Sequence, residues 1–278
     1  MRIAHTDQNI IKLKRIMVRT LQITNAIALV ATILINYLSN LGIFSSNTIS
    51  DISKKYDTLF TSAGYAFSIW GLIYILLFAF VIFYGPFVNA IDKKEIIIRK
   101  TGVWFIISCL ANSLWVFAWT NDHLLTSVLL MLILLLSLIK IISVYLHYHT
   151  VEHRYMHLFF VTPFSIYLGW ISVALIANMA IYLKKAQWGG FGISPQDWTI
   201  LLLALAALIN IYMIWKYRLY FTALVAVWAF SAIAVANSGN NLLFASSVLM
   251  AAILLVNIII RFIIARKKNL IAPKHNSG

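Results

Sequence analysis

Charged side chains are scarce in this sequence. Only 11% of its 278 residues are charged and 62% are hydrophobic, whereas about a quarter of a typical soluble protein is charged. The composition therefore excludes an ordinary soluble domain and predicts a polytopic membrane protein. The chain is not neutral, however, because its basic residues give a net charge of +14.

Acidic residues are missing from the middle of every long apolar run. Ionisable groups inside a membrane usually mark proton relays and ion-coupled transporters, so their absence argues against a carboxylate-driven pump. It also removes general acids and bases for catalysis at membrane depth. Lys140 comes nearest to a buried charge, but it lies close enough to a membrane face to snorkel. The 8 acidic residues, all in predicted loops or at helix ends, are Asp7, Asp51, Asp57, Asp92, Glu95, Asp122, Glu152 and Asp197.

Cysteine and proline are also rare. The single cysteine, Cys109, excludes an internal disulfide and is most simply a small core residue. None of the 4 prolines interrupts a predicted helix interior, and Pro163 falls in a first helical turn, where proline is tolerated. The chain contains no HExxH, CxxC, GxSxG or Walker-type glycine loop. An enzyme is therefore not the expected class.

The sequence contains long apolar runs. Each predicted span has the length needed to cross a hydrocarbon core of about 30 Å as a helix. The expected fold is an all-α, polytopic transmembrane bundle of about eight spans. The spans are predicted at 20–39, 60–84, 98–120, 124–146, 159–183, 198–215, 220–237 and 242–263.

The distribution of lysine and arginine predicts the orientation in the membrane. With a cytoplasmic N-terminus, all of the 22 basic residues fall inside except Lys54, Lys55, Lys184 and Lys185. Both termini are therefore predicted in the cytoplasm of a multi-pass cell-membrane protein. The positive charge then reflects topology and an attraction to anionic lipid, and nucleic acid is not an expected partner. Residues 20–38 form too long an apolar run for a signal peptide, so the first span is expected to remain uncleaved.

One histidine cluster has the spacing of a metal site. His149, His153 and His157 lie four residues apart in HYHTVEHRYMH and would share one face of a helix. Three imidazoles could hold a metal, but no fourth ligand accompanies them. The preferred interpretation is a polar cytoplasmic turn, and no metal site is predicted.

Aromatic residues recur at helical spacing in three of the predicted spans. Two of these faces also carry an asparagine, whose amide is unfavourable in lipid and should point into the bundle. Two interpretations stay open: the rings and amides pack helices together, or they line a pocket for a large, flat, apolar ligand. The candidate ligand-binding residues are Phe67, Trp70, Tyr74, Asn112, Trp115, Tyr167, Trp170 and Asn178.

The same three stretches resemble the TspO/MBR family, the translocator or tryptophan-rich sensory proteins. AFSIWGLIY (66–74) is similar to the family's second helix, LANSLWVFAW (110–119) to its N-x-x-W element, and PFSIYLGWISVALIAN (163–178) to its last helix. The resemblance covers residues 20–183. It implies a five-helix bundle that binds porphyrin, haem or a sterol-like molecule, and it suggests a role in sensing or stress response.

The resemblance also sets expectations for the rest of the chain. The loop at 40–59 would cap the pocket, where Lys54 and Lys55 could meet porphyrin propionates, although an ordinary solvated pair is preferred. The predicted organisation is a basic N-terminus (1–19), the five-helix core (20–183), three additional helices (184–263) and a basic tail (264–278).

The sequence also predicts the partners of the protein and leaves a second function open. The expected partners are the lipid bilayer and a hydrophobic small molecule, with a homodimer left open. The alternative function is a transporter or exporter of a small hydrophobic solute. It is suggested by the three additional helices and by an echo between FSIWG (67–71) and FSIYLG (164–169), which would be an inverted repeat.

Overall fold

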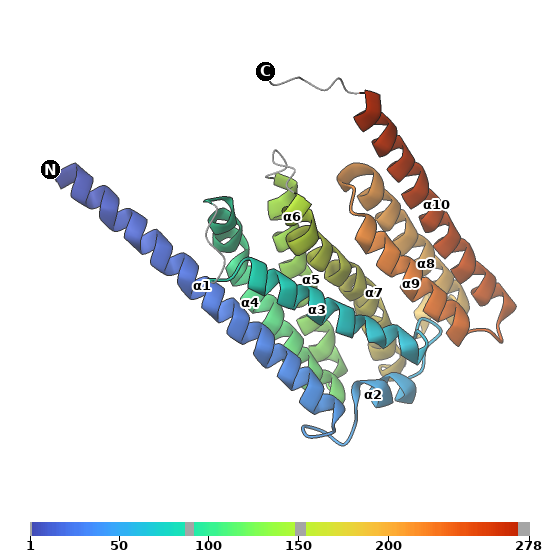
Figure 1. The fold of residues 1–278 in the computed structure, drawn as a ribbon. Helices are drawn as coiled ribbons and strands as arrows, with labels where there is room; N and C mark the ends of the chain where they lie inside the picture. Colours follow the sequence, from blue (N-terminus) through green and yellow to red (C-terminus); the bar gives the residue numbers. More distant parts are fainter. Residues whose placement is uncertain (1, 87–91, 148–153, 272–278) are drawn as a thin grey trace. The chain divides into compact units, whose positions relative to one another are not determined.

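The computed structural model describes residues 2–86, 92–147 and 154–271, and all regular structure in these ranges is helical (Figure 1). The α-helices are α1 (Arg2–Asn40), α2 (Ile49–Lys55), α3 (Ile69–Phe83), α4 (Asp92–Thr120), α5 (Leu124–His147), α6 (Arg154–Met156), α7 (Thr162–Lys185), α8 (Pro195–Tyr212), α9 (Tyr220–Ala236) and α10 (Asn241–Ile271). Short 3₁₀ turns span Gly64–Ser68 and Gly190–Gly192, and π turns span His157–Val161 and Met213–Tyr217.

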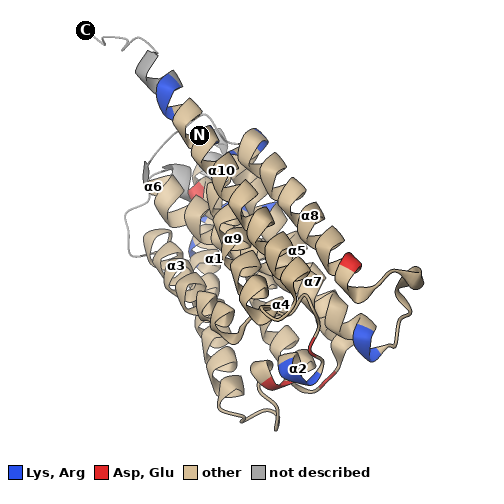
Figure 2. Cartoon of the chain, turned by 90° about the vertical axis from the view of Figure 1, so that its right-hand side faces the viewer, with Lys and Arg blue, Asp and Glu red and all other residues tan. Residues whose placement is uncertain are grey.

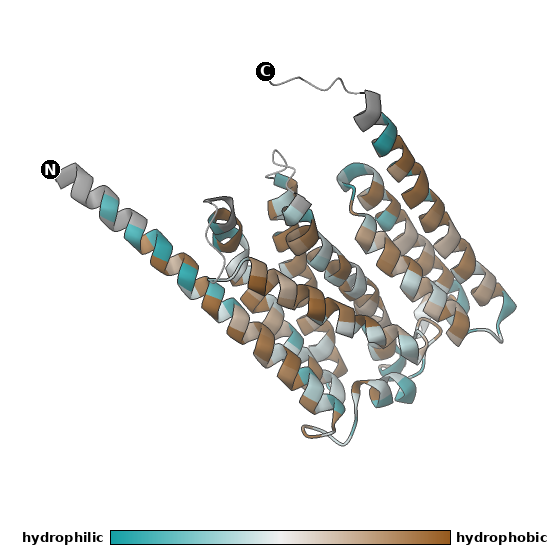
Figure 3. Ribbon diagram, in the orientation of Figure 1, coloured by the Kyte–Doolittle hydropathy of each residue, from teal (hydrophilic) through white to brown (hydrophobic). Residues whose placement is uncertain are grey.

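The helices have the length and composition of membrane spans. Within the described residues, 7 helices are long and apolar enough to cross a bilayer. The remaining predicted span corresponds to α9, which is apolar but has only 17 residues and is therefore about 26 Å long. Apart from α1, whose N-terminal half is hydrophilic, the helices have apolar middles and charged residues toward their ends (Figures 2 and 3). The chain is thus a multi-pass membrane protein.

The described chain divides into two compact units. Unit 1 comprises Met1–Thr58 and Phe67–Trp188, and unit 2 comprises Leu59–Ala66 and Gly189–Gly278. The sequence predicted one helix over 60–84, and here the structure differs. The α-helix begins only at Ile69, after a 3₁₀ turn, and the residues before Phe67 belong to unit 2.

Five helices of unit 1 form a closed ring. In order around the ring, α1 contacts α4, α4 contacts α5, α5 contacts α7, α7 contacts α3, and α3 contacts α1. The same helices lie side by side in Figure 1. Since each helix has two neighbours, each has one face available for the interior of the ring and one for lipid.

Helix α1 shows how its sequence selects the inward face. Its buried residues recur at intervals of four and three, the spacing of one helical stripe, while Ile27 on another face is 64% exposed. At Gly102 of α4 an added Cβ would lie 3.3 Å from the Cβ of Leu21, so the two backbones approach closely because this residue is glycine. The stripe consists of Asn25, Leu29, Thr32, Asn36 and Ser39.

Helix α7 is the most enclosed element of unit 1. Every residue from 163 to 171 is buried, and Pro163 lies in the first turn of the helix as predicted. Near this end of α7 the core is made of phenylalanines. The ring of Phe80 lies 4.9 Å from that of Phe164 and 5.4 Å from that of Phe105, and none of the three is exposed.

Unit 2 is a three-helix bundle of α8, α9 and α10, each in contact with the other two. The segment Leu59–Ala66 lies along α9. The Ala63 N–H donates to the Ala232 carbonyl (3.0 Å), and the Asn237 side-chain amide donates to the Leu59 carbonyl (3.0 Å). A stretch that precedes α3 in the sequence is therefore held by a helix near the other end of the chain.

Candidate functional site

The predicted aromatic residues come together inside unit 1, around Trp70. The centroid of the Trp70 ring lies 5.6 Å from that of Tyr74, 6.3 Å from Trp115, 5.8 Å from Tyr167 and 6.5 Å from Trp170. These residues come from α3, α4 and α7. Ring pairs at these separations stabilise the packing beyond the burial of apolar area.

The rings differ in how far they are buried. Trp115 and Trp170 are 4% and 3% exposed, whereas Trp70 and Phe67 are half-buried. The Phe67 ring lies 5.9 Å from that of Trp170, edge to face, although Phe67 belongs to the 3₁₀ turn and not to the predicted α-helix. Trp70 and Phe67, with the likewise half-buried Tyr74, therefore form the accessible margin of the cluster, and Trp115, Tyr167 and Trp170 are its enclosed members.

Four of the rings form a stacked column. Tyr74 stacks on Trp70, Trp70 on Trp115, and Trp115 on Trp119, with angles of 27°, 26° and 28° between the ring planes. The column leads from the middle of α3 to the C-terminal end of α4. Each ring of the column therefore has a face turned toward the next ring.

Asn112 connects three helices. Its amide oxygen accepts from Asn36 of α1 (2.8 Å), and its amide nitrogen donates to the Tyr167 hydroxyl of α7 (3.1 Å). Asn112 is fully buried, so the side chain points into the bundle as expected. Both ends of the amide are used by protein groups, which is the arrangement of a packing bridge.

Asn178 makes a second bridge. Its amide oxygen accepts from Trp115 Nε1 of α4 (2.9 Å), and its amide nitrogen donates to Ser127 Oγ of α5 (2.8 Å). The residue is 2% exposed. The bond from Trp115 Nε1 fixes the rotation of the Trp115 ring, which is one of the two inner members of the column.

Sequence reasoning did not select the α1 side of this network. Besides Asn36, Thr32 donates to the Cys109 carbonyl (3.1 Å), and Ser113 donates to Thr32 Oγ1 (3.2 Å). A signal for these residues was present, because Thr32 and Asn36 belong to the stripe of α1 that recurs every three or four residues.

Two buried polar atoms of the cluster have no hydrogen-bond partner among the described residues. They are Nε1 of Trp170 and the hydroxyl of Tyr74. Most buried polar groups in proteins are hydrogen-bonded. The indole nitrogen can only donate, so the cluster offers unused donors beside the rings.

The part of the loop after α1 that belongs to unit 1, residues 41–58, contacts the C-terminal ends of α4 and α7. Its helix α2 begins with a capping box, in which Thr48 and Asp51 bond to each other's backbone N–H. Ile52 is fully buried, and the carbonyl of Ile49 accepts from Trp119 Nε1 (3.0 Å). The last ring of the column is thus bonded to the loop.

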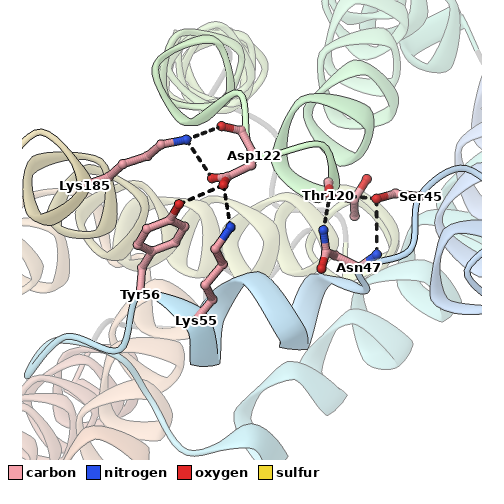
Figure 4. A network of polar contacts seen from close by, with 7 residues as sticks. All are labelled: Ser45, Asn47, Lys55, Tyr56, Thr120, Asp122 and Lys185. Atoms are coloured by element: carbon pink, nitrogen blue, oxygen red, sulfur yellow. Dashed lines mark hydrogen bonds and ion pairs between the residues drawn. The ribbon is translucent and has the colours of Figure 1, made fainter.

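Asp122, in the turn between α4 and α5, fastens this loop (Figure 4). Its carboxylate accepts from Lys55 Nζ and from the Tyr56 hydroxyl, both at 2.7 Å, and Lys185 Nζ at the end of α7 lies 2.9 Å away. Desolvation raises the pKa of Asp122, but the hydrogen bonds from the two ammonium groups and the phenol outweigh it and lower the pKa to about 2. The loop and the ends of α4 and α7 are therefore joined through one carboxylate.

Further contacts hold the loop at the same end. Ser45 Oγ donates to the Thr120 carbonyl (2.8 Å), and Lys184 donates to the Asp57 carbonyl. The sequence predicts an ordinary solvated pair at Lys54 and Lys55. The Lys55 side chain is 52% exposed, and in addition it forms an ion pair with Asp122.

The histidine cluster is only partly within the described residues. His149 and His153 lie outside them. His157 lies in the π turn before α7, with its Nε2 3.2 Å from the Tyr145 hydroxyl. No group of three potential metal ligands occurs in the part of the chain that the structure describes.

Comparison with known proteins extends the similarity beyond the five-helix core. A family model described as TSPO-like protein matches residues 22–263. The match includes α8, α9 and most of α10, so it is not limited to the residues that suggested the resemblance. No significant match was found among curated proteins or solved structures.

Proposed function

The chain belongs to the TSPO-like protein family, and from this membership we propose that unit 1 binds a large, flat, apolar ligand of the tetrapyrrole or sterol class. The ligand would contact the rings around Trp70, beneath the loop that carries α2. The proposed role of binding is in sensing or stress response. No catalytic step is part of this proposal.

One observation carries the proposal. Trp70 contacts four other rings of the cluster, yet it is only half-buried, while Trp115, Tyr167 and Trp170 are enclosed. A packing residue of this size would be expected to share the burial of its neighbours. A half-buried indole at the margin of a ring cluster is suited to receive another flat surface.

The polar groups of the cluster limit the chemistry of the ligand. The amides of Asn112 and Asn178 are used by protein groups, whereas Trp170 Nε1 and the Tyr74 hydroxyl are unpartnered donors. These donors suit a carbonyl or carboxyl oxygen on an otherwise apolar molecule.

Ligand charge is restricted by the loop. Its Lys55 and the nearby Lys185 already pair with Asp122, so porphyrin propionates would have to compete with an existing carboxylate. Within the proposed class, this favours a neutral sterol-like molecule over a porphyrin with two ionised propionates.

A titration tests the proposal. Protein in lipid nanodiscs is titrated with protoporphyrin, followed by porphyrin absorbance and tryptophan quenching, and in parallel with a fluorescent sterol. We expect saturable binding of at least one probe, and Trp70→Leu should weaken it about tenfold or more through the lost ring contacts. Trp104→Leu, a matched change at an exposed tryptophan of α4, should leave the affinity within about twofold.

The outcomes separate the alternatives. Equal affinity of the native protein and the Trp70→Leu variant would remove this cluster as the site. Directional flux of the bound probe across proteoliposomes would support the transport alternative in place of sensing.

A further inference from the structure

In unit 2, an arginine in the C-terminal half of α10 lies next to a tryptophan in the π turn that follows α8. Arg261 Cζ lies 5.8 Å from the centroid of the Trp215 ring, and Trp215 Nε1 donates to Asn257 Oδ1 at 2.9 Å. The bond to Asn257 fixes the indole, which in turn supports one face of the guanidinium. Nε of Arg261 is buried and has no hydrogen-bond partner among the described residues.

The depth of this pair follows from helix length. The N-terminal ends of α8 and α10 are tied by a hydrogen bond from Asn240 Nδ2 to Gln196 Oε1 (2.6 Å). Trp215 and Arg261 each lie about 20 residues farther along, which is about 30 Å at 1.5 Å per residue. This is the thickness of the hydrocarbon core, so the pair lies at the level of the lipid headgroups on the opposite side.

The charge at this end of unit 2 has one sign. The only acidic residue in the sequence of unit 2 is Asp197, which accepts a hydrogen bond from Ser194 at the N-terminal end of α8. The positive charge near the C-terminal ends of α8 and α10 can therefore be neutralised only by anions from outside unit 2. The basic side chains that the structure describes there are Lys216, Arg218, Arg261, Arg266 and Lys267.

Lys216 lies in the π turn Met213–Tyr217, which also contains Trp215. Its ammonium lies 5.1 Å and 5.4 Å from the ring centroids of Tyr212 and Tyr217, and it donates to the Tyr212 hydroxyl at 2.6 Å. Tyr212 is 52% exposed and Phe262, next to Arg261, is 59% exposed. The cationic groups thus lie next to apolar surface that can contact acyl chains.

From these observations we propose that Arg261 and Trp215 form a binding site for the phosphate of an anionic phospholipid. A planar guanidinium recognises phosphate oxygens with two parallel hydrogen bonds, and the Nε–H of Arg261 has no partner among the described residues. The headgroup depth and the exposed apolar neighbours select a lipid over a soluble phosphate. This site lies in unit 2 and is independent of the ligand proposed for unit 1.

Lipid competition tests the inference. The full-length protein in detergent is mixed with equal amounts of phosphatidylglycerol and phosphatidylcholine, and retained lipids are counted by native mass spectrometry. We expect the native protein to prefer phosphatidylglycerol, and Arg261→Gln to reduce this preference about tenfold through loss of a charge-assisted hydrogen bond. Arg266→Gln removes the same charge from an exposed arginine of α10 and should change it less than about twofold.

Two further variants test the site if Arg261→Gln folds poorly. Arg261→Lys retains the charge but not the planar fork, and Trp215→Leu removes the supporting ring; both should lower the preference for phosphatidylglycerol. Equal losses in Arg261→Gln and Arg266→Gln would overturn the site in favour of general electrostatic attraction. Displacement of the lipid by soluble glycerol phosphate would overturn the assignment to a membrane lipid.

Discussion

Two of the buried asparagines, Asn112 and Asn178, each link helices through two side-chain hydrogen bonds. Asn178 holds Trp115 of α4 and Ser127 of α5, and Asn112 holds Asn36 of α1 and Tyr167 of α7. Interhelical hydrogen bonds in membrane proteins average about 0.6 kcal/mol each, and an unsatisfied buried partner adds to the loss. These residues therefore contribute to stability whether or not a ligand is bound.

Replacing Asn178 tests this bridging role. We expect Asn178→Ala to destabilise the protein by about 1–3 kcal/mol, because it leaves Trp115 Nε1 and Ser127 Oγ without their partner. Thermal unfolding in detergent provides the measurement. Asn210→Ala is the matched control, since the Asn210 amide bonds only to the Ala206 carbonyl of its own helix. Similar unfolding temperatures for the two variants would contradict a bridging role.

The stability of the folded loop should depend on the protonation of Asp122 at acid pH. Although desolvation opposes it, hydrogen bonding lowers the pKa of Asp122 to about 2, below its usual value of about 3.9. The carboxylate therefore stabilises the folded loop fully above pH ~4, and this stabilisation is lost as the pH falls from ~4 toward 2. The environment of Trp119, which bonds to Ile49 of the loop, should change over the same interval and can be followed by its fluorescence.

The variant Asp122→Asn should behave at neutral pH as the native protein does in acid. We expect trypsin to cleave after Lys54 and Lys55 about two- to fivefold faster, as for the loss of a partly exposed ion pair. Asp197→Asn is the control, because Asp197 lies at the start of α8 in unit 2. Unchanged cleavage in Asp122→Asn would show that Asp122 does not fasten the loop.

At the scale of elements, the segment Leu59–Ala66 depends on α9. Trp228 Nε1 donates to the Ala66 carbonyl (3.2 Å), and the Trp228 ring packs edge to face on Tyr65 with centroids 5.2 Å apart. The variant Trp228→Phe keeps a ring but removes the donor. We expect hydrogen exchange at residues 63–66 to become about two- to tenfold faster, while the same change at Trp104 should leave it unaltered. Equal exchange in both variants would contradict the anchoring by Trp228.

Helical periodicity explains which elements were predictable. Trp70, Trp115 and Trp170 recur on helical faces, and the structure places their rings in one cluster. The spacing of Thr32 and Asn36 carried the same kind of information about α1. The segment before Phe67 has no such period. Its hydrogen-bond partner Trp228 is 162 residues away from Ala66, and no local pattern encodes so distant a contact.

At the scale of the whole molecule, the family match covers helices that hydropathy predicts only one by one. It runs from residue 22 to 263 and so includes helices of both units. The unit boundary does not follow the order of the chain, because Leu59–Ala66 leaves unit 1 between α2 and α3 and packs on α9. Apolar runs predict helices one at a time, so they cannot reveal which helices form a unit; that depends on side-chain contacts between distant segments.

Orientation in the membrane is the last property to test on the intact protein. The only natural cysteine, Cys109, is 5% exposed, so a membrane-impermeant maleimide should not label the native chain in intact cells. Gly189 lies in the loop after α7 predicted to be outside, and a Cβ added there meets no atom within 4 Å. We expect Gly189→Cys to be labelled in intact cells and Ser277→Cys only after permeabilisation, because basic residues are retained on the cytoplasmic side. The reverse pattern would contradict the predicted cytoplasmic termini and would place the loop bound by Asp122 inside the cell.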